Sequence, residues 1–218
     1  MPTMNEMIAA AEFTVAMRKF RQILVYVAPT TAAPVTTLTG PTGAFLAVPP
    51  AYIPVGLLRK DAGVTFPRSV DKSETESINH GSATREDTES DDRMVKFTAQ
   101  QTTKTVLELS QGLNLSGVTR AANGEVSFPH PELPDDMFYR LLVIGFDPKY
   151  QIGAGKFLPQ WQPMDFPETK WGNDVTDYEI TGKAFPDDVL GYSVWDIAVC
   201  GPGAITHAAA LGFTAAGP

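Results

Sequence analysis

A long stretch of this sequence carries no charge, yet it cannot form a long helix. Between Gln22 and Leu58 there is no acidic or basic residue, and prolines stand at positions 29, 34, 41, 49, 50 and 54. A membrane-spanning helix needs about 20 mainly apolar residues in one helical run, and proline interrupts such a run. We therefore expect a soluble protein in which 23–29 is a strand and 30–56 is loop-like, with short extended pieces.

The frequency of turn residues favours strands over helices in the rest of the chain. Gly and Pro each occur 18 times in 218 residues, which is typical of strands joined by loops. The segments expected to form strands are 23–29, 63–70, 94–101, 137–147, 156–166, 174–185 and 191–199, and an Asn-Gly turn predicts a hairpin within 121–128.

One predicted strand runs directly into the only helix that the sequence predicts clearly. In 94–101 apolar and polar residues alternate, the pattern of a half-buried strand. In 102–114 the spacing changes to that of a helix, which Thr102 or Thr103 can cap and Gly112 can end. The apolar side chains expected to face the core are Val95, Phe97 and Ala99 in the strand, and Val106, Leu107, Leu109 and Leu113 in the helix.

Two further segments indicate where their strands lie in a sheet. The segment 137–147 is apolar on both faces, so we expect either a central strand or a strand whose outer face a partner covers. In 156–166, Pro159 and Pro163 indicate an edge strand or an interrupted one, because proline cannot donate a ladder hydrogen bond.

These elements together predict a mainly β fold. We expect a β-sandwich or barrel with one short flanking α-helix, in a single domain that covers residues 1–218. The segment 1–22 is expected to be an N-terminal arm, and 200–218, which is small and apolar, a C-terminal arm without regular elements.

The negative charge of the chain is concentrated in one polar segment, 71–92. Two basic residues, Lys72 and Arg85, stand there against eight acidic ones, so the segment has a net charge of −6 out of −8 for the whole chain. Its acidic residues are Asp71, Glu74, Glu76, Glu86, Asp87, Glu89, Asp91 and Asp92. A loop of 22 residues is long for a compact β protein, which leaves a solvated loop that aids solubility or a functional loop. This charge disfavours binding to nucleic acid, which needs a basic surface.

The sequence offers no catalytic, metal-binding or cofactor-binding residues. His80, His130 and His207 have no neighbours at a recognised metal spacing, and the acidic segment lacks the spacing of a calcium loop. The "GAGK" at 153–156 lacks the first Gly and the Ser/Thr of a phosphate-binding loop. The single cysteine, Cys200, excludes an intrachain disulfide and is expected to pack as a small apolar residue. A structural or binding role is therefore favoured over an enzyme.

Several loose motifs occur in a particular order along the chain. They are "VYVAPTTAAP" (25–34), "VGLLRKDAGVTF" (55–66), the polar segment with Gly81 and Arg85, "QQTTKTVLELSQG" (100–112), "YRLLVIGFD" (139–147) and "GNDVTDYEITGKAFPDD" (172–188). In this order the chain resembles the major tail tube proteins of long-tailed, siphovirus-type phages, particularly those that infect actinobacteria. The resemblance covers most of 23–190. It departs from the family at Gln101, where Glu is common, and at 48–56, where a Trp often stands.

The resemblance implies a structural virion protein without enzymatic activity or cofactor. Six subunits would form a ring whose sheets join into an inner barrel, and stacked rings would form the tail tube, a conduit that DNA passes without specific binding. The implied location is the virion tail, assembled in the host cytoplasm. The implied partners are the protein itself, the tape-measure protein, the tail terminator and the tail assembly chaperones.

In the family the long loop between early strands reaches the neighbouring ring. The resemblance therefore implies that 71–92 is an assembly loop, disordered in the free subunit and ordered on assembly. Its candidate residues are Asp71, Glu74, Glu76, His80, Arg85, Glu86, Asp87, Glu89, Asp91 and Asp92, and those of the flanking helix are Thr103, Val106, Leu107, Leu109 and Leu113.

Two alternatives stay open at this point. One is another virion β-sandwich, such as a capsid decoration or head–tail connector protein, which forms a fixed small oligomer and no polymer. The other is a carbohydrate-binding module in which Trp161 and Trp171 stack on a sugar.

Overall fold

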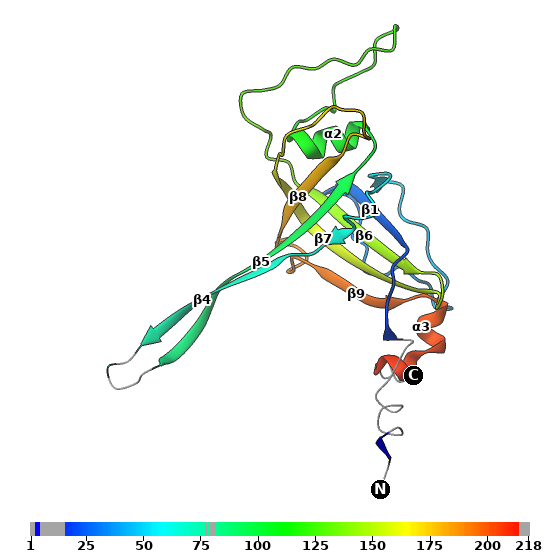
Figure 1. Cartoon of the computed structure of the whole chain (residues 1–218), viewed down its shortest axis with the longest axis vertical. Coiled ribbons are helices and arrows are strands. Elements are labelled where there is room, and N and C mark those ends of the chain that lie inside the picture. The colour runs from blue at the N-terminus through cyan, green and yellow to red at the C-terminus, as the bar shows by residue number, and fades with distance from the viewer. Residues whose placement is uncertain (1–2, 5–15, 77, 79–81, 214–218) are drawn as a thin grey trace.

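One antiparallel sheet of nine strands dominates the computed structural model, which describes residues 3–4, 16–76, 78 and 82–213 (Figure 1). The strands are β1 (Gln22–Pro29), β2 (Ile53–Pro54), β3 (Val64–Thr65), β4 (Arg68–Glu76), β5 (Ala83–Ala99), β6 (Tyr139–Asp147), β7 (Ile152–Asp165), β8 (Tyr178–Phe185) and β9 (Trp195–Cys200). The helices are α2 (Lys104–Gln111), α3 (Pro202–Thr206) and α4 (Ala208–Leu211). The expected mainly β fold with a short flanking helix is confirmed.

The sheet curls until its two ends meet. Its strand order is β2-β1-β6-β7-β8-β5-β3, while β9 pairs with the first half of β7. The segment that follows β2 then connects both ends: Val55 N donates to Val25 O of β1, and Arg59 N donates to Thr98 O of β5. The strands therefore close into a barrel, and the segment after β2 bridges the gap between β1 and β5.

The enclosed core explains the burial pattern of β5 and α2. Val95, Phe97 and Ala99 are at most 1% exposed, and the Phe97 ring stacks on Trp161 with centroids 6.3 Å apart. Val106 and Leu109 of α2 belong to the same cluster, so the helix packs on the barrel, at its upper end in Figure 1.

The limits of α2 are those that the sequence predicts. The Thr103 Oγ1 accepts a hydrogen bond from Val106 N, 3.3 Å away, which satisfies one of the unpaired donors at the helix start. Gly112 ends the helix with φ at 62°, a left-handed conformation that glycine adopts without strain.

A second cluster covers the outer face of β1, β6 and β7. The segment 30–52 supplies Val35, Leu38 and Tyr52, which pack with Leu142 and Phe157. Because the neighbouring side chains of β6 point into the barrel, this strand is buried on both faces. The first of the two predictions for 137–147, a central strand, is therefore confirmed.

Of the two predictions for 156–166, the edge strand is wrong and the interrupted strand is confirmed. β7 is central, with β6 on one side and β8 and β9 on the other. Its prolines stand at irregular positions: the β6–β7 register shifts beside Pro159, and the β7–β8 register shifts after Pro163. Proline is tolerated where the ladder is already broken.

Three smaller expectations also need correction. The Asn-Gly turn in 121–128 forms, with Gly124 at φ 91°, but no strand flanks it. The predicted strand 63–70 is split between β3 and β4. The C-terminal segment contains α3 and α4 instead of lacking regular elements. Most of the expected N-terminal arm lies outside the described residues.

Candidate functional site

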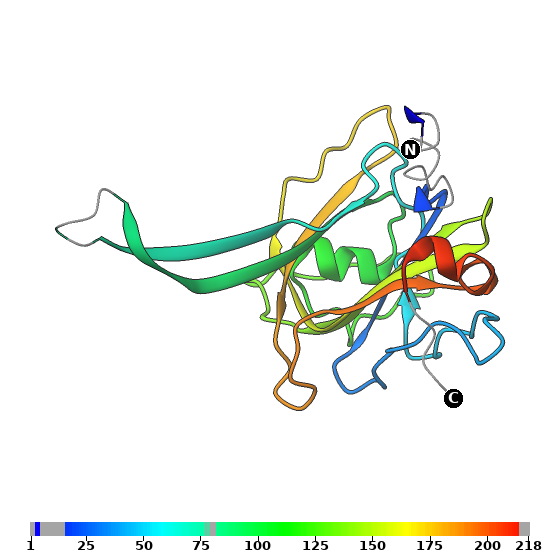
Figure 2. The same ribbon diagram turned by 90° about the horizontal axis from the view of Figure 1, so that it is seen from below.

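A two-stranded hairpin extends from the barrel and carries the eight acidic residues of 71–92, which hold most of the net charge of the chain. It consists of β4 and the part of β5 from Ala83 to Arg93, and we call it the arm. Both views show the arm pointing away from the barrel (Figures 1 and 2). At about 3.3 Å per residue, the nine residues of β4 span about 30 Å. The arm is thus long enough to contact a neighbouring molecule.

The expectation that 71–92 is a loop is wrong for most of its length. Residues 71–76 and 83–92 are strands, and the turn that joins them lies mainly outside the described residues. Polar residues occupy both faces, so the sequence has no hydrophobic alternation from which a strand could be predicted. Whether the arm orders only on assembly stays a prediction.

The two faces of the arm differ in chemistry. One face carries mainly carboxylates and small hydroxyls, and the other mixes basic and acidic side chains. The first contains Ser69, Asp71, Ser73, Thr75, Arg85, Asp87, Ser90 and Asp92, and the second contains Arg68, Val70, Lys72, Glu74, Glu86, Thr88, Asp91 and Arg93. A register shift after Asp71 leaves Glu89 without a partner in the ladder, in the position of a β-bulge.

Ion pairs fix the base of the arm. Arg68 donates to both carboxylate oxygens of Asp91, at 2.6 and 3.0 Å, and Arg93 contacts the same carboxylate at 3.0 Å. The hydrogen bond from Arg68 holds the pKa of Asp91 below its ordinary value. Asp92 pairs with Lys183 of β8 at 2.7 Å, which ties the base to the barrel.

Farther out, like charges face each other. Glu74 stands directly opposite Glu86, an arrangement that destabilises a strand pair. Lys72 offsets part of this repulsion, because its Nζ lies 2.6 Å from Glu86, and the hydrogen bond to Glu86 raises the pKa of Lys72. On the opposite face Arg85 pairs with Asp87 at 2.6 Å.

Three carboxylates of the arm have no ion-pair partner in the described part of the chain. They belong to Asp71, Glu74 and Glu89, of which Asp71 accepts a hydrogen bond from Ser90 at 3.0 Å. Glu76 belongs to β4, but its side chain and His80 lie outside what the structure describes. These three carboxylates are the charges that the arm can offer to a partner.

A two-stranded ribbon that is exposed on both faces has little to stabilise it. A hairpin without a hydrophobic face is marginal in water. Val70 is 39% exposed, and Ile78, beyond β4, is fully exposed. The arm therefore gains stability wherever another surface covers it.

The predicted helix residues do not join this site. Val106 and Leu109 are fully buried, Leu113 is 4% exposed, and Leu107 packs against the core at its margin. In Figure 1 the helix and the arm lie at different ends of β5. The helix is part of the barrel, and only the acidic residues form the candidate site.

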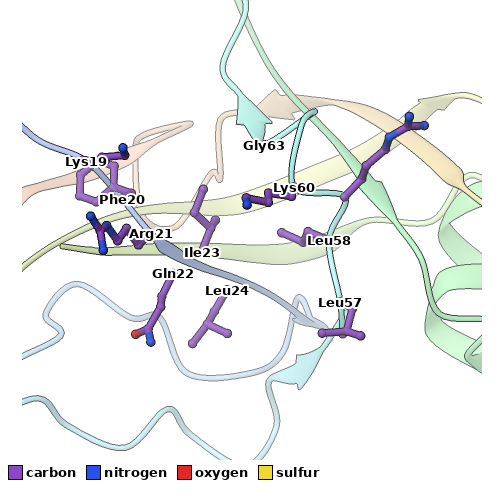
Figure 3. A pocket seen from close by; sticks show the side chains of 12 residues that line it. Lys19, Phe20, Arg21, Gln22, Ile23, Leu24, Leu57, Leu58, Lys60 and Gly63 are labelled. Carbon is purple, nitrogen blue, oxygen red and sulfur yellow. The ribbon is translucent and has the colours of Figure 1, made fainter. Parts of the chain in front are cut away.

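A basic groove that is not among the sequence predictions lies beside β1. Its walls come from 19–24 and 56–63, and Lys19, Arg21 and Lys60 stand around it (Figure 3). A signal for it existed, because basic clusters at 18–21 and 59–60 flank the uncharged stretch 22–58. The two clusters meet because the segment after β2 returns to the edge of β1.

The tryptophans do not form a common sugar-binding surface. Trp161 is fully buried in the core of the barrel, whereas Trp171 is 87% exposed. A carbohydrate-binding site in which both stack on a ligand is therefore excluded.

Other features add no chemistry to the site. Cys200 is buried, and this burial raises the pKa of its thiol to about 11, so it is a poor nucleophile at neutral pH. Across the described residues, no three His, Cys, Asp or Glu side chains gather as a metal site would require. None of the described helices has the length and apolarity of a membrane span.

Comparison with known proteins finds no protein-family model and no curated protein that matches the chain. The features of the molecule that bear on function are therefore the arm, the barrel and the motif order in the sequence.

Proposed function

We propose that this protein is a phage tail tube subunit, which self-assembles into stacked rings and catalyses nothing. The observation that carries the proposal is the acidic arm, a β-hairpin exposed on both faces that extends from a closed barrel. The motif order of the sequence supplies the family, and with it the expectation of six subunits in a ring.

The exposed surface of the barrel supports assembly. In the described chain, each of the strands β2, β3 and β9 pairs with another strand on one side only. Their other sides are edges to which a neighbouring subunit can add a strand. Large apolar side chains stand in the solvent near these edges, including Ile53 at 52%, Leu57 at 65% and Phe66 at 41% exposure. A ring of subunits would cover such edges without leaving any free.

The charge of the protein suits a conduit for DNA. Outside 71–92 the chain has a net charge of only −2, since −6 of its −8 lies in that segment. A protein whose net charge is negative has no overall attraction for a phosphate backbone. The tape-measure protein, the terminator and the assembly chaperones remain proposed partners through the resemblance.

The test is light scattering after size exclusion, with negative-stain microscopy of the same fractions over time and concentration. We expect rings or hollow tubes that grow with concentration. A discrete trimer or pentamer without polymer would favour a decoration or connector protein instead. A monomer at every concentration would contradict self-assembly of the isolated chain.

A further inference from the structure

The groove beside β1 collects positive charge that no described residue neutralises. It has a volume of about 930 Å³ and lies between 19–24 and 56–63 (Figure 3). Lys19, Arg21 and Lys60 line it and are exposed, and the ion pairs of the described chain involve none of the three. Arg59, also at the groove, is already paired with Asp177 at 2.5 Å.

The groove also exposes a strand edge. β6 pairs with the whole of β1, whereas β2, on the other side, pairs only with Tyr26 and Val27. On that side no strand of the described chain lies beside Gln22–Leu24. Two apolar side chains, Leu24 at 48% and Leu57 at 65% exposure, stand at the same place. Such an edge can accept an added strand, and the cations select an acidic one.

The arm has the complementary properties. It offers three carboxylates without ion-pair partners, at Asp71, Glu74 and Glu89, against three such cations in the groove. Within the described residues β4 pairs only with β5, so its other edge is free to add to a strand. The arm cannot serve its own groove, because both views show it pointing away from the barrel.

We propose that the groove between β1 and 56–63 is the docking site for the acidic arm of a second copy of this chain. The arm lies along the free edge of Gln22–Leu24, and its carboxylates reach Lys19, Arg21 and Lys60. The inference rests on the proposed function for its biological setting, and it names the surface that receives the arm. The contact is heterologous, since the arm of one copy meets the groove of the next, and such contacts propagate along a polymer.

The test pairs two full-length or nearly full-length variants, each of which keeps one half of the arm–groove contact and lacks the other half. In the acceptor, Asn-Gly replaces residues 72–89, joining Asp71 to Ser90, which face each other in the ladder. In the donor, Lys19, Arg21 and Lys60 are replaced by Glu, so that only the arm is intact. Light scattering of the mixture should show a one-to-one heterodimer that weakens as salt rises.

Three controls separate the charge contact from other causes. Adding Asp71→Lys, Glu74→Lys and Glu89→Lys to the donor should weaken the heterodimer on the order of a hundredfold, because like charges then meet. A second acceptor keeps its full length and carries the same three lysine substitutions in its arm. It replaces the shortened acceptor if removal of 72–89 disturbs folding. An acceptor with Lys104→Glu, Arg120→Glu and Lys170→Glu, exposed residues outside the groove, should bind as before.

The outcomes distinguish this inference from the proposed function. No heterodimer with either acceptor, while the intact chain still forms tubes, would overturn the docking site alone. A heterodimer from variants of a chain that never forms rings or tubes would support the docking site and contradict the tail tube. A further acceptor also carries Lys19→Glu, Arg21→Glu and Lys60→Glu. If it forms the heterodimer as readily as the first acceptor does, the proposed site is overturned.

Discussion

β5 passes from the barrel into the arm, and its two halves are stabilised in different ways. From Met94 to Ala99 it lies between β8 on one side and β3 on the other, with side chains such as Phe97 almost fully buried. From Ala83 to Arg93 it pairs only with β4, and most of its side chains are exposed. The same strand thus serves the core at one end and solvent, or a partner, at the other.

This difference indicates which part of the molecule depends on other molecules. Buried apolar area stabilises the barrel half within the subunit. The arm half depends on backbone pairing and on exposed ion pairs, which contribute little each. Regions of this kind open locally at low cost, independently of the core. We therefore expect the barrel to fold alone and the arm to become rigid in an assembly.

The largest expected effect is in the barrel half of β5. Phe97→Ala removes a ring that is 1% exposed and stacked on Trp161, so we expect a loss of about 3–5 kcal/mol in the free energy of unfolding. Denaturant unfolding measures it. The matched change in the arm, Val70→Ala, should cost less than about 0.5 kcal/mol. Equal losses of unfolding free energy in the two variants would contradict the view that the two halves of β5 are stabilised differently.

A buried charge at the other side of the barrel is the next largest effect. Arg140 is 8% exposed, donates to the carbonyl oxygen of Ala32, and lies 4.0 Å from the equally buried Asp187. Arg140→Ala leaves that carboxylate without its cation, and we expect a loss of about 3 kcal/mol by thermal or denaturant unfolding. Lys72→Ala, which breaks the exposed pair with Glu86, serves as the control and should leave the global unfolding transition unchanged.

The cap of α2 should have a moderate effect. Thr103→Ala removes the side-chain acceptor for Val106 N, and we expect a loss of about 1 kcal/mol. Thr103→Ser keeps the acceptor and should retain most of the stability. Assembly should be unchanged in both variants, because the helix belongs to the barrel. A selective loss of assembly in Thr103→Ala would place the helix at an interface.

The smallest expected effect on global stability is at the base of the arm. Since the pKa of Asp91 is lowered in the folded protein, its ion pair with Arg68 stabilises the arm above the ordinary pKa of an aspartate. That contribution is lost as the pH falls through the lowered value. An NMR titration should show the amide signals of the arm changing in this acidic range while those of the barrel stay constant. In Asp91→Asn this step should disappear; its persistence would assign it to another group.

The sequence predicts the parts of the fold in which burial follows a period. Val95, Phe97 and Ala99 alternate because one face of β5 meets the core, and Val106 and Leu109 repeat because one side of α2 does. The prediction of an edge position for β7 was wrong because its prolines stand at register shifts, where a central strand tolerates them.

The candidate site was predictable only in part. The concentration of acidic residues in 71–92 is visible in the sequence, but the hairpin is not, because neither of its faces is apolar. The groove was missed because Lys19 and Lys60 are far apart in the sequence and line the same groove only through tertiary contacts, such as the hydrogen bond from Val55 N to Val25 O. Contacts between distant segments of this kind leave no local period in a sequence.

The central claim is that the barrel folds alone and that the arm serves assembly. The most direct measurement compares the intact chain with the chain in which Asn-Gly replaces residues 72–89, by denaturant unfolding and by light scattering with microscopy. We predict the same free energy of unfolding for the two barrels, and rings or tubes only for the intact chain. Tubes of normal length from the shortened chain, or a barrel that no longer folds, would contradict the account.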